Sequence, residues 1–336
     1  MNRAESNNLS WIFVDKKDIK KARGLHRGHI LRETFFSKSF QSRNDEYMTS
    51  QLGIPSLDGS CYELIVSTNE VSYQKDGPIH VSSDGRYSLL RMEVEEREMG
   101  TEVSVYRAYQ KIFQRIEADN MGHLVRIWNF IPQLLTQDQN LERYRQFNIG
   151  RNMAWKDFGP KNDNGEPASP AATGIGAADG PIVIECLVSK IPVLHLQNPR
   201  QTPAHLYSQR FGPKPPVFSR ATVCFDKISP LVFISGTASL VGEDVMWKGD
   251  PEKQTKEALY NISVLISKKN FSNYGLDIGL TLNNLESVRV YIKNKTDYPL
   301  IKGCVESAIN PEKAIYLNND ICRPDFLVEI EGIARS

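Results

Sequence analysis

The sequence predicts an α+β protein in which mixed β-sheets are backed by helices. Short segments that alternate apolar and polar residues are separated by turn residues, which is typical of strands. Between them, residues 104–119 and 251–267 carry apolar side chains at helical spacing. Each helix is followed by a strand, at 124–128 in the first half and at 288–292 in the second. This internal repeat predicts two related strand-strand-helix-strand units with a composite site between them.

Length, composition and charge narrow the class of protein. At 336 residues the chain is long enough for two domains, or for one large domain with a substantial core. Its 41 Lys and Arg residues nearly balance 40 Asp and Glu residues, so neither nucleic acid nor an anionic membrane is expected as the main partner. No apolar run is long enough to cross a bilayer, and the N-terminus lacks a hydrophobic signal core. We therefore expect a cytoplasmic protein, in which a local basic pocket for a small anion stays possible.

The cysteines and histidines do not predict a metal site. The five cysteines are odd in number and widely scattered, and no CxxC spacing occurs. His26 and His29 lie in a basic stretch without an acidic or thiol neighbour in the sequence. We therefore expect neither disulfides nor a bound metal.

The first half begins with an irregular region and continues into a meander, a helix and a strand. Residues 1–50 are polar and irregular apart from a short strand at 11–14, and the basic run at 16–32 is typical of solvated loops. The elements expected after this region are strands at 62–66, 79–81 and 87–92, a helix at 104–119, a strand at 123–131 and a short helix or turn at 141–147.

Two long loops are expected in the middle of the chain. Residues 159–180 are rich in Gly, Pro, Ala and Asp, and their backbone amides could line a pocket. The segment 173–180 has the glycine spacing G-x-G-x-x-x-G, no strand precedes it, and a strand instead of a helix follows it at 182–188. This context excludes a dinucleotide-binding loop. Residues 197–219 form a second loop, dense in Pro, Arg and aromatic side chains, and an ordered loop of this length is often functional.

The second half repeats the order of the first. The expected elements are strands at 221–225 and 230–235, a small-residue turn at 236–239, a helix at 251–267, a strand at 287–292, a helix at 298–309 and a strand at 314–317. We place the domain boundary so that residues 1–190 form the first domain and residues 191–336 the second.

The last expected strand combines core residues with carboxylates. From Phe326 onward the side chains alternate, so Phe326, Val328 and Ile330 share one face while Glu329 and Glu331 share the other. Two interpretations of this pattern stay open. The segment could be an edge strand with one wet face, or Glu329 could point into a pocket as an acid.

The second half resembles the RidA/YjgF family at residues 254–262, 288–292 and 328–333. That family forms trimers of β-sheets backed by helices, with anion-binding clefts between subunits. A narrower resemblance, to the chorismatase family, covers most of the chain and rests on six motifs in the family's order. These are YRQFNIGR at 144–151, PAATGIG at 170–176, PRQTPA at 199–204, FSRAT at 218–222, ISGTAS at 234–239 and ICRPD at 321–325.

The chorismatase resemblance implies both a fold and a reaction. The chain is expected to be a monomeric RidA/YjgF-like pseudo-trimer, with a degenerate RidA-like domain and its loops at 1–190 and a RidA/YjgF-like domain at 191–336. Chorismatases remove the enolpyruvyl group of chorismate as pyruvate, without a cofactor. Some members hydrolyse chorismate to a dihydroxycyclohexadiene carboxylate, others form 3-hydroxybenzoate, and a further group gives hydroxybenzoate mixtures. We expect 3-hydroxybenzoate as the product here.

Chorismate carries two carboxylates and an enol ether, so its site needs cations at two places and an acid. The planar fork of arginine bonds both oxygens of a carboxylate, and the candidates are Arg151, Arg220 and Arg323. Tyr144 and Tyr207 are candidate hydroxyl donors. The alternative for each arginine is a structural ion pair, and for each tyrosine half-buried packing.

By resemblance, Glu329 is the acid that protonates the enol-ether carbon. A carboxyl group in a pocket poor in water can stay protonated near neutral pH. The role of Glu331, its neighbour on the same face, stays open. Cys322 matches family members that form 3-hydroxybenzoate, whereas Ala238 matches members that hydrolyse. We give Cys322 more weight because a thiol can take part in opening the intermediate, although it could also be a small buried hydrophobe.

Three alternatives to this function stay open. The first is chorismate hydrolysis to the dihydroxydiene. The second is a RidA-like imine deaminase, although that fold unit does not need the long N-terminal half or the two motif loops. The third is a non-catalytic module that binds a small anion.

Overall fold

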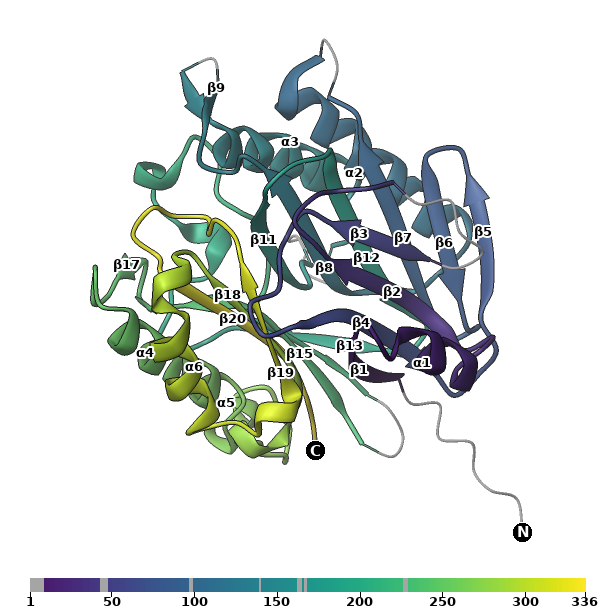
Figure 1. The fold of residues 1–336 in the computed structure, drawn as a ribbon. Coiled ribbons are helices and arrows are strands. Elements are labelled where there is room, and N and C mark those ends of the chain that lie inside the picture. The colour runs from purple at the N-terminus through teal and green to yellow at the C-terminus, as the bar shows by residue number, and fades with distance from the viewer. Residues whose placement is uncertain are drawn as a thin grey trace.

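The computed structural model describes residues 9–42, 48–96, 99–138, 140–161, 165, 168–225 and 229–336. Its main strands form three sheets (Figure 1). The N-terminal sheet has the order β1 (Leu9–Asp15), β4 (Ser60–Ser67), β2 (Ile30–Phe36), β3 (Thr49–Leu52). The middle sheet has the order β11 (Ala171–Ala177), β8 (His123–Pro132), β12 (Ile182–Ser189), β7 (Tyr87–Val94), β6 (Ile79–Ser83), β5 (Ser72–Asp76). The C-terminal sheet has the order β13 (Val193–Leu196), β14 (Ala221–Cys224), β15 (Leu231–Ala238), β20 (Val328–Arg335), β18 (Leu285–Ile292), β19 (Ala314–Asn318).

Helices back the sheets on their outer faces (Figure 1). The helices are α1 (Ile19–Leu25), α2 (Gly100–Ala118), α3 (Arg143–Phe158), α4 (Pro251–Leu265), α5 (Lys268–Ser272) and α6 (Tyr298–Glu306). The short elements are two hairpins, β9 (Gln137–Asp138) with β10 (Leu141–Glu142) and β16 (Leu240–Val241) with β17 (Asp244–Val245), and the 3-10 turns η2 (Ala204–Leu206), η3 (Gln209–Phe211), η4 (Leu282–Asn284), η5 (Lys295–Asp297) and η6 (Pro311–Lys313). Among the described residues, no helix is both long and apolar enough to span a membrane.

The three sheets repeat one topology. The strand orders β3-β2-β4-β1, β11-β8-β12-β7 and β19-β18-β20-β15 correspond position by position. In each, the first pair is parallel and the next two pairs are antiparallel. The chain therefore folds as three related units, which we call the N-terminal, middle and C-terminal units after their sheets. The prediction of α+β mixed sheets in a pseudo-trimer on one chain is confirmed.

Each unit has its own core, and the three units share a further one. The middle unit packs α2 and α3 on its sheet around Tyr109 and Trp155, and the C-terminal unit packs α4 and α6 around Ile262. A central core joins side chains from all three sheets, among them Leu31 of β2 and Phe233 of β15. The expected boundary near residue 190 falls between β12 and β13, and its role as a domain boundary stays a prediction.

Six buried charged side chains lie where the three sheets meet, and we call them the central ion cluster. Its members are Arg32 of β2, Glu63 of β4, Arg126 of β8, Glu185 of β12, Arg289 of β18 and Glu331 of β20. The arginines lie on corresponding strands of the three units, and so do the glutamates. Each unit therefore contributes one arginine and one glutamate, as expected where repeated units meet around a common axis.

Ion pairs link the members of the central ion cluster across unit boundaries. Arg32 bonds Glu63 and also donates from Nη1 to Glu185 at 2.8 Å. Arg289 donates two hydrogen bonds to Glu63, at 2.5 and 2.7 Å, and lies 3.2 Å from Glu331. Burial raises the pKa of Glu63, but Arg289 and Arg32 outweigh that effect and lower it overall. Breaking one buried pair by removing a single partner costs about 3–5 kcal/mol, because the other charge is left uncompensated.

Several element predictions are confirmed with small changes in their ends. The helices at 104–119 and 251–267 are α2 and α4, and the strands at 123–131 and 287–292 are β8 and β18. α4 begins where the sequence favours it, because the Asp250 side chain accepts a hydrogen bond from the Lys253 amide at 2.9 Å. The loop at 197–219 contains the two 3-10 turns η2 and η3 and the isolated β-bridge residues Gln201 and Ser219.

The prediction for the N-terminal region was wrong. The first 50 residues hold α1, β2 and the start of β3, in addition to the strand expected at 11–14. Arg32 lies at the end of the basic run that was expected to be solvated, yet its side chain is fully buried. Ion pairs to Glu63 and Glu185 compensate its charge. Partners 31 and 153 positions away in sequence supply this stabilisation, so local pattern carries no sign of it.

Three further local predictions were wrong, and one was only partly right. The segment expected as a loop at 173–180 lies largely in β11, which pairs in parallel with β8. The turn expected at 236–239 is the end of β15, where the pairing register with β20 shifts between Ile234 and Thr237. The helix or turn expected at 141–147 is partly confirmed, because the helix α3 begins at Arg143, but it follows a two-residue strand and is 16 residues long. The edge-strand interpretation of the last strand fails because β20 lies between β15 and β18.

Candidate active site

The position of β20 inside its sheet sets the direction of its polar side chains. Val328 and Ile330 point into the core beneath α4, as the alternation predicts. Glu329 and Glu331 point to the opposite side, where the middle unit lies, and are each only 4% exposed. The polar face of this strand is therefore turned to a neighbouring unit instead of to solvent.

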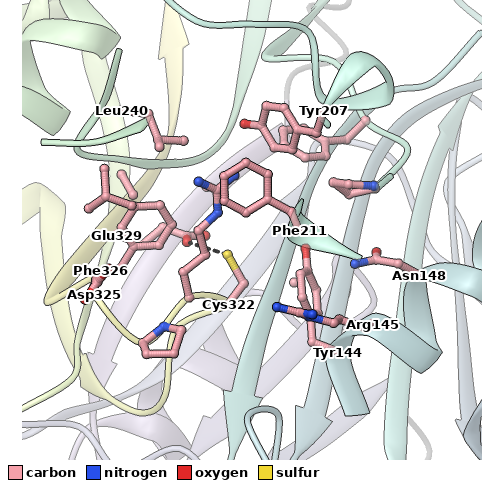
Figure 2. A pocket seen from close by; sticks show the side chains of 18 of the residues that line it. Tyr144, Arg145, Asn148, Tyr207, Phe211, Leu240, Cys322, Asp325, Phe326 and Glu329 are labelled. Carbon is pink, nitrogen blue, oxygen red and sulfur yellow. Dashed lines mark hydrogen bonds between the residues drawn. The ribbon is translucent and has the colours of Figure 1, made fainter. Parts of the chain in front are cut away.

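A cavity of about 320 Å³ lies between the middle and C-terminal units. Figure 2 shows Glu329 and Cys322 on one side of it and the side chains of α3 on the other. All eight residues predicted for the site line this cavity, and these are Tyr144, Arg151, Tyr207, Arg220, Ala238, Cys322, Arg323 and Glu329. They come from α3, from the loop at 197–219 and the residue after it, from β15 and from β20 with the turn before it. The predicted composite site between two units is thus a real cavity of ligand size.

Glu329 is a carboxyl group kept neutral by its surroundings. Burial, followed by the negative charge of Glu331, raises the pKa of Glu329 to about 8, although Arg126, Arg220 and Arg323 oppose this. The Cys322 thiol lies 4.0 Å from Glu329 Oε2. Burial and the nearby Glu329 also raise the pKa of Cys322, so the thiol stays neutral. At pH 7 Glu329 is therefore a protonated acid facing the cavity.

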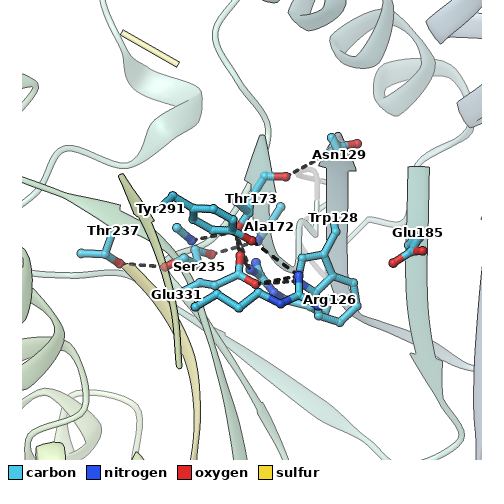
Figure 3. A network of polar contacts seen from close by, with 12 residues as sticks. Arg126, Trp128, Asn129, Ala172, Thr173, Glu185, Ser235, Thr237, Tyr291 and Glu331 are labelled. Atoms are coloured by element: carbon cyan, nitrogen blue, oxygen red, sulfur yellow. Dashed lines mark hydrogen bonds and ion pairs between the residues drawn. The ribbon is translucent and has the colours of Figure 1, made fainter. Parts of the chain in front are cut away.

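Glu331 is held differently from its neighbour, although both lie on the same face of β20. It accepts hydrogen bonds from Arg126 Nη2 at 2.7 Å, Trp128 Nε1 at 2.9 Å and Thr173 Oγ1 at 2.5 Å (Figure 3). It does not line the cavity. The question left open by the sequence is thus answered by geometry, because Glu331 is a carboxylate of the central ion cluster while Glu329 faces the cavity.

Two glycines make room for the acid and for an aromatic wall. A Cβ atom on Gly236 would lie 1.9 Å from Glu329 Oε1, so only glycine leaves space for this carboxyl group. The Gly236 amide donates to Thr173 Oγ1 at 3.0 Å, which ties the shifted register of β15 to β11. A Cβ on Gly174 would lie 3.1 Å from the Tyr144 ring. The small residues of both motifs are therefore explained by close approach across the unit boundary.

Arg151 and Arg220 are buried beside the cavity, and each has one N–H donor without a hydrogen-bond partner among the described residues. Each is 2% exposed, and among the described residues neither Nε has a hydrogen-bond partner. Arg151 donates from Nη2 to Asn148 Oδ1 at 2.7 Å, and Arg220 donates from Nη2 to the Tyr207 hydroxyl at 2.6 Å. These bonds fix the orientation of both guanidinium groups. Among the described ion pairs neither guanidinium group has a carboxylate partner, and a buried arginine that lines a cavity without a counter-charge is suited to bind an anion.

Arg323 is held under an aromatic cover from the loop at 197–219. Its guanidinium carbon lies 3.7 Å from the centre of the Phe211 ring and 5.0 Å from that of Tyr207. Its Nη1 donates to the Glu243 carbonyl at 2.7 Å. The alternative of a structural bridge between Arg323 and a nearby carboxylate side chain has no support among the described ion pairs.

Sequence reasoning missed several residues that line the cavity. Asn148 lies between Tyr144 and Arg151 on one face of α3, at spacings of four and three residues. The full length of this helix would have indicated it. Phe211 and Gly236 lie inside segments that the sequence marked only as a loop and a turn. No sequence pattern indicated Glu142, because the strand that holds it is only two residues long.

The fold and the cavity define a single-chain pseudo-trimer with a buried acid and arginines between two of its units. The family described as "Chorismatase FkbO/Hyg5-like, N-terminal" matches residues 63–188. A 3-hydroxybenzoate synthase of Streptomyces hygroscopicus is 34% identical over 303 residues, which cover 86% of this chain and 88% of the relative. A chorismatase of Streptomyces rapamycinicus is 35% identical over 235 residues, which cover 67% of this chain and 68% of the relative.

The fold comparison agrees with these relatives. A crystal structure of a chorismatase matches 98% of this chain and 98% of its own, with a TM-score of 0.87 and 25% sequence identity. The chain therefore belongs to the chorismatase family.

Proposed function

We propose that this protein removes the enolpyruvyl group of chorismate as pyruvate and forms 3-hydroxybenzoate. One observation carries the proposal: Glu329, a carboxyl group whose burial raises its pKa, faces a cavity lined by buried arginines. The S. hygroscopicus relative, named a 3-hydroxybenzoate synthase, covers most of the chain and supports this choice of product. Chorismate is the expected partner, with its two carboxylates bound by arginines.

The cavity supplies the two things that chorismate chemistry requires. Arg151 and Arg220 line the cavity and supply positive charge for the two carboxylates, and Arg323 adds a third positive charge. Glu329 gives its proton to the methylene carbon of the enol ether. This carbon becomes a methyl group, and the ether carbon and oxygen form an oxocarbenium ion. The pKa of Glu329, about 8, keeps most of this carboxyl group protonated at pH 7, while still allowing the proton to leave. The arginines also stabilise Glu329 after it has become a carboxylate.

The fate of the oxocarbenium ion decides the product. If water attacks it, a hemiketal forms and collapses to pyruvate and the dihydroxydiene. If the neighbouring ring hydroxyl displaces the group instead, an epoxide forms and aromatises to 3-hydroxybenzoate. Cys322 lies beside Glu329 as a neutral thiol, while Ala238 pairs directly with Glu329 across β15 and β20. We propose that Cys322 favours the second route.

Replacing Cys322 by alanine should change the product ratio. We expect Cys322→Ala to release pyruvate but to shift the ring product toward the dihydroxydiene, because the space left by the thiol admits water near the reacting carbon. Liquid chromatography of the products against both standards measures the ratio. An unchanged ratio would show that Cys322 is only a packing residue.

Incubation with chorismate tests the proposed function itself. Lactate dehydrogenase detects pyruvate as it forms, and chromatography identifies the ring product. We expect pyruvate and 3-hydroxybenzoate in equal amounts. Absence of pyruvate rejects the proposal and would favour an imine deaminase or a module that only binds anions.

A monomeric state and a cytoplasmic location remain predictions. The monomeric state is supported by the cavity, because both of its walls come from one chain.

A further inference from the structure

One acidic side chain of the cavity has no part in the reaction steps assigned to Glu329 and the arginines. Glu142 is the last residue of β10 and directly precedes α3. It stands at the N-cap position of α3, but its side chain does not cap the helix. It is 9% exposed and lines the cavity. Helix capping therefore does not explain a buried glutamate at this place.

The other carboxyl groups lining the cavity are all accounted for. Asp244 pairs with Arg210 at 2.5 Å, and Asp325 pairs with Lys248 at 2.7 Å, both toward solvent. Glu329 is the acid. Among the described residues, the one ion pair of Glu142 is a loose contact of 3.9 Å to Arg145 Nε. Glu142 is thus the single carboxyl group of this lining without a close partner or a role.

A free carboxylate is costly in a cavity built for a dianion. It repels both substrate carboxylates, and burial raises its pKa although Arg145 opposes this. A buried glutamate with a raised pKa is, however, a better proton acceptor than an exposed one. Burial without a close counter-charge and a raised pKa are both expected of a group that takes up a proton during the reaction.

We propose that Glu142 is a second catalytic residue, the base that removes the proton from the ring hydroxyl at C4 of chorismate. This proposal rests on the proposed function. In chorismate the C4 hydroxyl and the enolpyruvyl ether at C3 lie on opposite faces of the ring. The hydroxyl oxygen attacks C3 from the face opposite the leaving group. The base that takes the C4 proton therefore stands on the face of the ring opposite the enolpyruvyl group, and two carboxyl groups on different walls of the cavity suit this geometry.

The structure has such an arrangement. Glu142 comes from the middle unit and Glu329 from the C-terminal unit, and these two units form the walls of the cavity. Burial raises the pKa of Cys322, and the charges of Glu329 and Glu142 both add to this effect, so the thiol lies near both carboxyl groups. Acid and base thus approach the same space from two units.

The proton balance closes with these two residues. Glu329 protonates the methylene carbon, and the C3–O bond breaks with its electron pair moving to the oxygen, which becomes the keto oxygen of pyruvate. The C4 oxygen forms its bond to C3 while Glu142 takes its proton. The C4–O bond then opens, Glu142 returns the proton to the oxygen, and Glu329 takes the C3 hydrogen as a proton. The C3–H electron pair completes the aromatic ring, and both residues regain their starting states.

The test compares Glu142→Gln with Glu142→Asp. We expect Glu142→Gln to lower kcat for 3-hydroxybenzoate by about 10²–10⁴-fold, because general base catalysis is lost. Glu142→Asp keeps the carboxylate and should recover part of that loss. In the inactive Glu329→Gln background, calorimetric titration should show that Glu142→Gln binds chorismate at least as tightly, since a repelling charge is gone. The acidic limb of the pH profile of kcat should also be absent in Glu142→Gln.

Two results would overturn the role of Glu142. One is a loss in kcat of less than tenfold in Glu142→Gln. The other is a loss that comes with weaker chorismate binding, because a residue that only shapes the cavity acts in that way. Both results differ from a failure of the proposed function, in which the unaltered protein releases no pyruvate from chorismate.

Discussion

Glu329→Gln lowers pyruvate release from chorismate by about 10²–10⁴-fold, while chorismate binding is retained. Glutamine has the shape of a neutral glutamic acid and fits the space that Gly236 leaves open. It cannot give a proton to the methylene carbon, so only the chemical step is lost. The coupled pyruvate assay measures kcat, and calorimetry measures binding in the same samples.

A second glutamine variant in the same sheet serves as the control for Glu329→Gln. Glu286 lies on β18, pairs with Arg335 at the surface at 2.9 Å and does not line the cavity. Loss of a surface pair costs about 0–1 kcal/mol, so Glu286→Gln should turn over chorismate normally. Unchanged turnover in Glu329→Gln would remove Glu329 from the mechanism.

Glu331→Gln lowers both the stability of the fold and the pH at which activity is lost. The variant leaves Arg126 and Arg289 without the buried counter-charge of Glu331, which costs about 3–5 kcal/mol of unfolding free energy. It also removes the charge that helps to raise the pKa of Glu329. Glu329 acts as an acid only when protonated, so activity falls as pH rises through its pKa. Because Glu331→Gln lowers that pKa, the fall in activity comes at a lower pH in the variant.

The repeat in the fold supplies a control for Glu331→Gln. Glu63 holds the corresponding place in the N-terminal unit, pairs with Arg32 and Arg289, and does not line the cavity. Glu63→Gln should destabilise the fold by a similar amount, as urea unfolding measures, with a much smaller change in the pH profile. Equal pH profiles for the two variants would contradict the assignment of Glu331 as the residue that tunes the acid.

Local pattern predicted the long helices of the middle and C-terminal units well and the N-terminal unit poorly. α2 and α4 have long apolar faces that belong to one segment each, so the sequence shows them directly. β2 and β3 are held by β4 and by ion pairs to distant glutamates, which no local window contains. β11 was taken for a loop because its glycines serve close packing across a unit boundary. A Cβ on Gly176 would lie 2.9 Å from the Asp320 carbonyl oxygen.

The candidate site was predicted more completely than the fold around it. All eight predicted residues meet in one cavity because their motifs lie at the boundary between two repeated units. Alternation in the last strand placed Glu329 and Glu331 together, but it could not separate them. That separation depends on Arg126, Trp128 and Thr173, which come from the middle unit. Physical contacts between units are invisible to a pattern within one segment.

The pH dependence of kcat/KM for the unaltered protein tests the central claim most directly. This ratio reports the ionisation of groups in the free enzyme, and the carboxylates of chorismate do not titrate on the alkaline side. With Glu329 as the neutral acid and its pKa at about 8, kcat/KM should fall tenfold for each pH unit well above that value. A value that stays constant up to about pH 10, roughly two pH units above the pKa of the acid, would contradict the account.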